Sequence, residues 1–204
     1  ALASILVCSA REPKPLMKDF IGLNGHTVQF KPDLYRPVCS LVRDYHPVSW
    51  DLAEETHKPA PFPFAKNRVD WSKVYGSWKE KEWTTNACLM FESIPLASWT
   101  TLETDARRYG ENFAREFGPS GSRQLVQSVE IGNEPGKWSD ADYGRIFRAM
   151  ATGLRAGDPK LKIATCNLSA GKSGDYEKSV TSLKGLHDFV DVLTIHTYAQ
   201  LTGW

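Results

Sequence analysis

LVQSVEIGNEPGKWSDADYGRIFRAMATGLRAGDPKLKIATCNL, residues 125–168, contains a strand, a helix and a second strand in series. The run 125–135 is apolar and ends in polar residues, which predicts a strand, and KIATCNL at 162–168 predicts the next one. Ser139 with Asp142 predicts a helix start, and Gly157, Asp158 and Pro159 predict its end. The helix has one apolar stripe: Tyr143, Ile146, Phe147, Met150 and Leu154. Two strands joined through a helix are expected to pair in parallel.

The same alternation extends in both directions along the chain. Further strands are predicted at 19–28, 41–46, 86–93 and 191–198. Helices are predicted after an Asp70 N-cap, from a Thr100–Glu103 capping box to Gly118-Pro119, and over roughly 175–189. The segment between His46 and Asp70 has Pro59, Pro61 and Pro63 at alternate positions, which predicts an ordered surface loop. Six strands with no hairpin signal between them indicate an α/β protein with a parallel sheet.

Two parallel architectures are compatible with this pattern, and the strand ends favour one of them. A doubly wound sheet usually has a Gly-rich phosphate turn after its first strand, and Gly22 with Gly25 does not make that motif. A (β/α)8 barrel places its chemistry at the carboxyl ends of many strands. Polar side chains stand where the apolar runs end: Asn24, His26, Arg43, His46, Glu92, Asn133, Glu134, Asn167, His196 and Tyr198. We therefore predict a TIM-type (β/α)8 barrel.

The predicted barrel occupies residues 19–204 and has about six of its eight β/α units. The last predicted strand is apolar at Val190, Val192, Leu193 and Ile195, which is unsuited to an exposed edge. We therefore expect a downstream segment or a second chain to complete the barrel. Residues 1–18 are expected to be an N-terminal extension or the remnant of a secretory signal, because Leu2–Cys8 is apolar.

Composition excludes several classes of protein. The 204 residues carry 25 Lys and Arg against 24 Asp and Glu, so there is no basic field for a nucleic-acid partner. No run approaches the ~18 apolar residues of a membrane span. The four cysteines (Cys8, Cys39, Cys88 and Cys166) form no CxxC pair, so we expect buried free thiols rather than a zinc motif or a disulfide framework.

Val129–Pro135 (VEIGNEP) is the most specific stretch for function. An Asn-Glu-Pro at the end of a fourth strand resembles the acid/base motif of clan A glycoside hydrolases, the retaining (β/α)8 glycosidases. The following Trp and the helix ended by Asp158-Pro159 are most similar to families 39 and 79. The resemblance implies that Glu134 is the general acid/base and that Asn133 binds the sugar 2-hydroxyl. It further implies a β-linked oligo- or polysaccharide substrate, no cofactor or metal, and a secreted or extracellular protein.

Further residues match the same family pattern by position. Arg43 resembles a second-strand Arg that supports the nucleophile; an ion pair with neighbouring Asp44 is the alternative. His196 and Tyr198 resemble a sixth-strand His-x-Tyr pattern that lines the sugar site, and a buried His–Tyr pair is the alternative. Trp138 is a candidate for stacking on a sugar ring or for bracing its loop. His46 is a weaker candidate for substrate binding.

The sequence departs from the family at one residue that the reaction requires. Retaining glycosidases use a second carboxylate as nucleophile, at the end of a seventh strand, and no such strand is predicted here. Glu177 falls in the crossover before the sixth strand and is no substitute. The main prediction is a retaining O-glycosyl hydrolase whose nucleophile lies outside this chain. The alternatives are a non-catalytic carbohydrate-binding or structural barrel and, least favoured, a zinc hydrolase, for which Asn24-Gly25-His26 supplies a single His.

Overall fold

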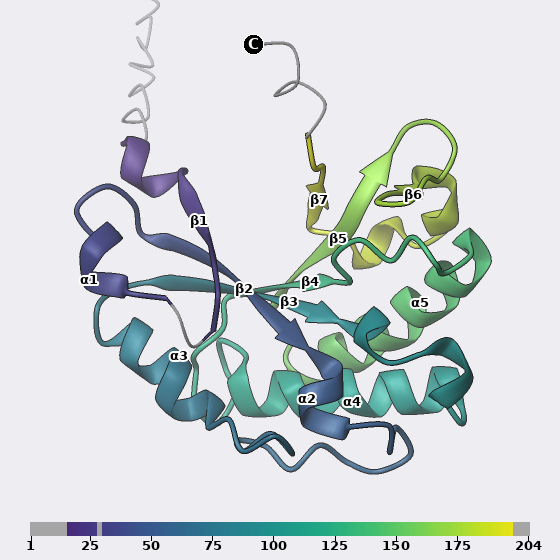
Figure 1. Cartoon of the computed structure of the whole chain (residues 1–204), viewed down its shortest axis with the longest axis horizontal. Coiled ribbons are helices and arrows are strands. Elements are labelled where there is room, and N and C mark those ends of the chain that lie inside the picture. The colour runs from purple at the N-terminus through teal and green to yellow at the C-terminus, as the bar shows by residue number, and fades with distance from the viewer. Residues whose placement is uncertain (1–15, 28–29, 198–204) are drawn as a thin grey trace, which may run out of the picture.

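A curved parallel sheet, covered on one face by helices, makes up the computed structural model, which describes residues 16–27 and 30–197 (Figure 1). The strands are β1 (Gly22–Gly25), β2 (Leu41–Pro47), β3 (Thr84–Met90), β4 (Ser128–Ile131), β5 (Lys162–Ser169), β6 (Lys178–Ser179) and β7 (Val192–Thr194). β1 to β5 are neighbours in chain order, and β5 pairs with both β6 and β7. Every strand pair in this described part of the chain is parallel, as predicted.

The helices are α1 (Pro32–Tyr35), α2 (Val48–Leu52), α3 (Trp71–Lys79), α4 (Leu102–Phe117) and α5 (Asp140–Gly157). α3, α4 and α5 lie along the same face of the sheet, and the two figures agree on this arrangement. Asp70 caps α3 by accepting from the Lys73 amide, and Ser139 caps α5 by accepting from the Asp142 amide. The predicted stripe of α5 is fully buried, because it packs between the sheet and α4.

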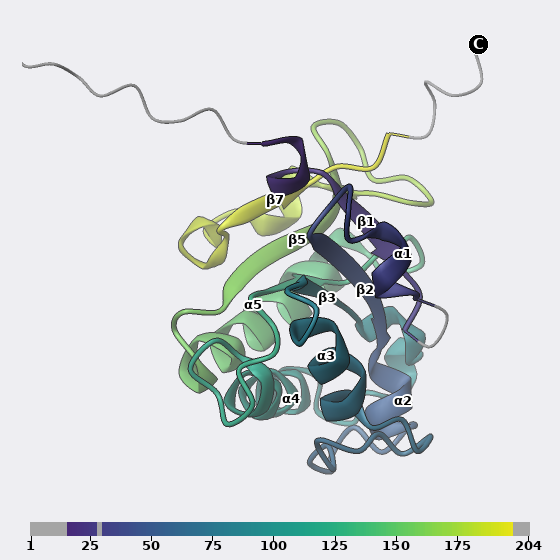
Figure 2. The same cartoon turned by 90° about the vertical axis from the view of Figure 1, so that its left-hand side faces the viewer.

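The other face of the sheet is concave and encloses a cavity. Side chains and backbone from β1, β2, β3, β4, β5 and β7 together line a space of about 370 Å³. Figure 2 shows the sheet turning so that β1 and β7 both lie at the end of the molecule away from α2 and α4. The architecture is therefore a half-barrel of the (β/α)8 type, and the predicted fold class is confirmed. The predicted strands correspond to β1 to β5 and β7.

Three predicted elements differ in the structure. No α-helix forms over 175–189; this segment contains β6 and the 3-10 turns η4 (Val180–Leu183) and η5 (His187–Phe189). Ser and Thr hydroxyls there bond to nearby backbone, as Ser179 does with the Thr181 amide, and this competes with helical hydrogen bonding. The predicted loop at 46–70 includes α2. α4 starts from Thr101 rather than Thr100, and Asp105 accepts from the Thr101 amide and hydroxyl.

Two predictions from composition can be compared with the described residues. Cys39, Cys88 and Cys166 are buried free thiols, as predicted, and Cys8 lies outside the described residues. No helix in the described ranges is long and apolar enough to cross a membrane.

Candidate active site

The turn that follows β4 presents the predicted acid/base residue. Gly132 ends the strand in the left-handed region, at φ 84°, and a Cβ at this position would lie 2.5 Å from Cε1 of Phe91. The Gly132 amide donates to the carbonyl of Leu89, and the Asn133 carbonyl accepts from the Asn167 amide. The turn is therefore anchored to the ends of β3 and β5, and only glycine fits its first position without strain.

Arg43 is the central cation of the concave face. Its Nε and Nη2 bond both oxygens of Glu130 at 2.5 and 2.8 Å, a bidentate pair across β2 and β4. Nη2 also donates to Oδ1 of Asn133 at 2.8 Å, and Nη1 donates to Oδ1 of Asn24 at 3.0 Å. The guanidinium lies 5.0 Å from the ring centroid of Tyr45. Arg43 thus links β1, β2 and β4, and it holds the side-chain amide oxygen of Asn133, the predicted 2-hydroxyl ligand.

Glu134 is joined to β7 through a histidine. Nδ1 of His196 lies 2.7 Å from Oε1 of Glu134, and the His196 amide donates to Oδ1 of Asn167 at 2.8 Å. On the other side of the ring, Nε2 lies 3.9 Å from Oε1 of Glu130. The imidazole therefore stands between two carboxylates, and β4, β5 and β7 all contribute to its position.

Glu92 is a third carboxyl group at this end of the sheet. It belongs to the 3-10 turn η2 (Phe91–Ser93) after β3, and its Oε1 accepts from the Asn133 amide at 2.9 Å. Burial raises the pKa of Glu92 to about 7, and the negative charge of Glu130 adds to the rise. A cavity of about 550 Å³ opens beside Glu92 and Glu134, with Pro95, Leu96, Lys137 and Asp175 among its other walls.

His46 is not part of this site, which corrects its prediction as a substrate-binding residue. It is fully buried among the helices, with Nδ1 2.8 Å from the Tyr75 hydroxyl and Nε2 2.7 Å from Oδ2 of Asp51. Its ring stacks on Trp71 at 3.8 Å. The physical reason is strand alternation, because His46 is three positions from Arg43 and so points to the opposite face of β2.

The same alternation decides between the two interpretations of Arg43. Asp44 is buried on the outer face, where it accepts from the Thr27 and Tyr75 hydroxyls. The alternative of an Arg43–Asp44 ion pair is therefore wrong, and Arg43 lies in the site. Tyr198 lies outside the described residues.

Trp138 braces the loop between β4 and α5. Its ring packs edge-on against Phe91 at 4.8 Å and is only 4% exposed, so no face of it is open to a sugar. Its carbonyl accepts from the buried ammonium of Lys178 at 2.7 Å. The structure thus agrees with the bracing interpretation of Trp138 and not with stacking.

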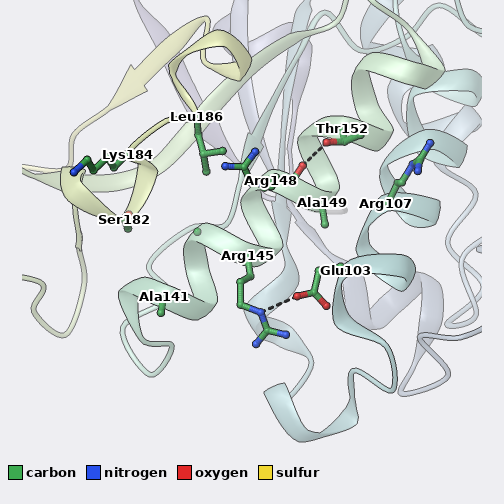
Figure 3. Close-up of a pocket in the computed structure, with 11 residues that line it drawn as sticks. Glu103, Arg107, Ala141, Arg145, Arg148, Ala149, Thr152, Ser182, Lys184 and Leu186 are labelled. Atoms are coloured by element: carbon green, nitrogen blue, oxygen red, sulfur yellow. Dashed lines mark hydrogen bonds and ion pairs between the residues drawn. The ribbon is translucent and has the colours of Figure 1, made fainter.

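A third cavity, of about 430 Å³, lies on the outer surface between α4, α5 and η4 (Figure 3). Arg107, Arg145, Arg148 and Lys184 are among its walls, and Arg145 pairs with Glu103. None of the predicted site residues lines it, so the chemistry is not expected there. No group of three or more His, Cys, Asp or Glu side chains in the described part of the chain is placed to hold a metal ion.

No role was predicted for Glu130, and Glu92 was predicted only as a polar residue at the end of a strand. The signal for Glu130 was present, because Ser128 and Glu130 alternate with the apolar Val129 and Ile131 and so share the inner face of β4. The contact between Glu92 and the Asn133 amide depends on two turns, η2 and the Gly132 turn, and no pattern in the sequence predicts it.

Comparison with known proteins identifies the fold. No protein-family model and no curated protein sequence matches the chain. Among solved structures, a glycoside hydrolase superimposes with a TM-score of 0.59 at 14% identity, over 84% of this chain and 53% of that chain. The endo-beta-1,4-mannanase from Thermotoga petrophila gives 0.59 at 13% identity, over 91% and 54%. Thermotoga maritima Cel5A in complex with mannotriose gives 0.50 at 15%, over 84% and 55%.

These similarities show that the chain has part of the (β/α)8 fold that is found in proteins including glycoside hydrolases. The chain spans about half the length of each of the three structures. At identities this low the likeness is one of fold.

Proposed function

We propose that this chain is the larger part of a retaining O-glycosyl hydrolase that acts on a β-linked oligo- or polysaccharide. The observation that carries the proposal is the Asn133–Glu134 turn at the carboxyl end of β4, where Glu134 lines a cavity and Asn133 is fixed by Arg43. In the (β/α)8 fold this end of the sheet is where catalytic residues gather. The VEIGNEP motif at this place resembles clan A, with families 39 and 79 the most similar.

In this proposal Glu134 supplies both proton transfers. As the glycosidic bond breaks, its carboxylic acid gives a proton to the leaving oxygen while a second carboxylate attacks the anomeric carbon. Glu134, now ionised, then takes a proton from the water that releases the sugar from that carboxylate. His196, 2.7 Å from Glu134, orients the carboxyl group between these steps. Asn133 binds the 2-hydroxyl, and the resemblance to clan A assigns contact with the nucleophile to Tyr198.

The nucleophile of this proposal lies outside the described residues. Glu130 is held by two hydrogen bonds from Arg43 on a buried strand, and Glu92 is engaged by the Asn133 amide. The proposal therefore assigns the role of nucleophile to neither carboxylate. We propose that a downstream segment or a second chain supplies it together with the remaining strands, covering Leu193 and Ile195, which are exposed at β7. Secretion is part of the same proposal, as suits a polysaccharide substrate.

The engagement of Glu92 and Glu130 also favours a second candidate, a carbohydrate-binding barrel without catalysis. Both candidates use the same cavity, and they differ in turnover. A titration of oligosaccharides monitored by NMR detects binding in either case, whereas hydrolysis separates them.

The test of the enzyme proposal is Glu134→Gln in a catalytically complete form, in which the segment or chain that supplies the nucleophile is present. The variant is assayed on a natural glycoside with a poor leaving group. Removing a general acid costs about 10²- to 10⁴-fold in rate, so activity should nearly disappear while stability is retained. Glu177→Gln, in the crossover, is the control and should behave as wild type. Full activity of Glu134→Gln on the poor leaving group would refute the assignment, and binding without turnover by the complete wild-type form would favour the carbohydrate-binding candidate.

A further inference from the structure

Glu92 is in contact with the backbone that carries the proposed acid/base and has no role in the reaction described above. Its Oε1 accepts from the Asn133 amide at 2.9 Å, whereas its Oε2 is inaccessible to solvent and has no hydrogen-bond partner among the described residues. A buried carboxyl oxygen without a donor is energetically costly, so such a group needs a compensating role.

The hydrogen bond between Glu92 and the Asn133 amide is the contact of this turn that a substitution can remove. The amide of Gly132 and the carbonyl of Asn133 are held by backbone groups of Leu89 and Asn167, which no substitution removes. The Asn133 amide, in contrast, is held by a side chain. We propose that Glu92 is a positioning residue, which fixes the Asn133–Glu134 turn through this amide and fixes it more firmly when ionised than when protonated.

The charge dependence follows from hydrogen-bond strength. An amide bonds a carboxylate about twice as strongly as it bonds a neutral acceptor. The groups that act on the Glu92 carboxyl from the protein side are Glu130 of β4 and the thiols of Cys88 and Cys166. On the cavity side stand Glu134, Lys137 and Asp175. Burial and Glu130 raise the pKa of Glu92 to about 7, so its charge changes near neutral pH.

The first test needs no activity. The Asn133 amide signal is followed by NMR from pH 5 to 9 in the chain and in Glu92→Gln, with exposed Glu103→Gln on α4 as control. The wild-type and control signals should titrate with a midpoint near the pKa of Glu92, about 7, and the titration should be lost in Glu92→Gln. If Glu92→Gln does not fold, Glu92→Asp replaces it, because a carboxyl one methylene shorter no longer reaches the amide. An Asn133 signal that titrates alike in wild type and variant would overturn the proposal.

The second test rests on the proposed function and asks what positioning achieves. Acid catalysis matters for an alkyl leaving group and hardly at all for dinitrophenolate. Glu92→Gln should therefore lower kcat on the alkyl glycoside by about tenfold or more, since small misplacements of a catalytic group are costly. KM for the alkyl glycoside should stay within about twofold. So should kcat/KM for the dinitrophenyl glycoside, because it reports only the first bond cleavage, which needs no acid for this leaving group. Equal loss on both substrates would mean a merely structural role and would overturn the proposal. These rates are measured in the form that includes the segment or chain supplying the nucleophile. If this complete wild-type form hydrolyses neither glycoside, the proposed function fails, and the amide titration still decides the role of Glu92.

Discussion

Replacing Arg43 with Met tests whether the concave face depends on one buried ion pair. The Glu130 side chain is 1% exposed and that of Arg43 is 18% exposed. Removing one partner of a buried pair costs about 3–5 kcal/mol, because the other charge stays buried without compensation. The partial exposure of Arg43 and the imidazole of His196, 3.9 Å from Glu130, place the expected loss near the lower end, about 3 kcal/mol.

The loss should depend on the carboxylate that Arg43 leaves behind. Without Arg43, the Glu130 carboxylate stays buried with no guanidinium beside it, and an uncompensated buried charge is the source of the cost. The deficit of Arg43→Met should therefore shrink when the charge of Glu130 is removed as well. Adding Glu130→Gln to the variant should restore most of the free energy of unfolding.

The assay is urea unfolding followed by circular dichroism, with the m-value checked for two-state behaviour. Arg145→Met is the matched control, because Arg145 and Glu103 form an ion pair whose side chains are 52% and 56% exposed. Its loss should be much smaller than that of Arg43→Met. A deficit of Arg43→Met below about 1 kcal/mol, or one that Glu130→Gln does not reduce, would refute the importance of the buried pair.

Two other predictions concern stability. Burial raises the pKa of Asp44 to about 6, so its contribution to stability is lost as pH rises through that value. Asp44→Asn should therefore reduce the fall in unfolding free energy between pH 5 and 7.5 by about 1.4 kcal/mol in urea titrations; an unchanged fall would contradict this. Gly132→Ala should cost about 2–4 kcal/mol, from the left-handed backbone and the clash with Phe91, whereas Gly185→Ala, at φ 72° with open space around it, should cost about 1 kcal/mol. Equal losses in thermal unfolding would show that the contact with Phe91 is unimportant.

Much of the fold could be predicted from local pattern. The spacing of apolar residues and the capping residues predict the strands and long helices. The Ser139 cap and the buried stripe of α5 lie where the sequence predicts them. The predicted helix over 175–189 is wrong because it was inferred from the position of this segment between two strands. It was not inferred from a helical stripe of apolar residues. Its buried apolar residues are few, and Gly185 takes a left-handed conformation that interrupts any helix.

Part of the site could be predicted from the sequence, and the alternation of side chains along a strand explains which part. Arg43 and His46 stand an odd number of positions apart on one strand, so they cannot both face the cavity, and the sequence contained that information. β4 ends before Gly132, so the alternation of side chains no longer predicts the directions of Asn133 and Glu134. Their directions depend on a left-handed turn packed against Phe91, and such contacts between distant segments are not written in local periodicity.

On β2, the side chains of the outer face stabilise the fold, and those of the inner face belong to the candidate active site. On the outer face, Asp44 and His46 bond to Tyr75 in the layer between sheet and helices, closed to solvent. On the inner face, Arg43 bonds to Glu130 and Asn133, beside the turn that opens on a cavity. Side chains alternate along β2, so the hydrogen bonds of Asp44 and His46 on the outer face hold the strand that carries Arg43. They thereby fix the position of Arg43 relative to β4. The buried polar groups outside the site therefore contribute to its geometry without touching any substrate.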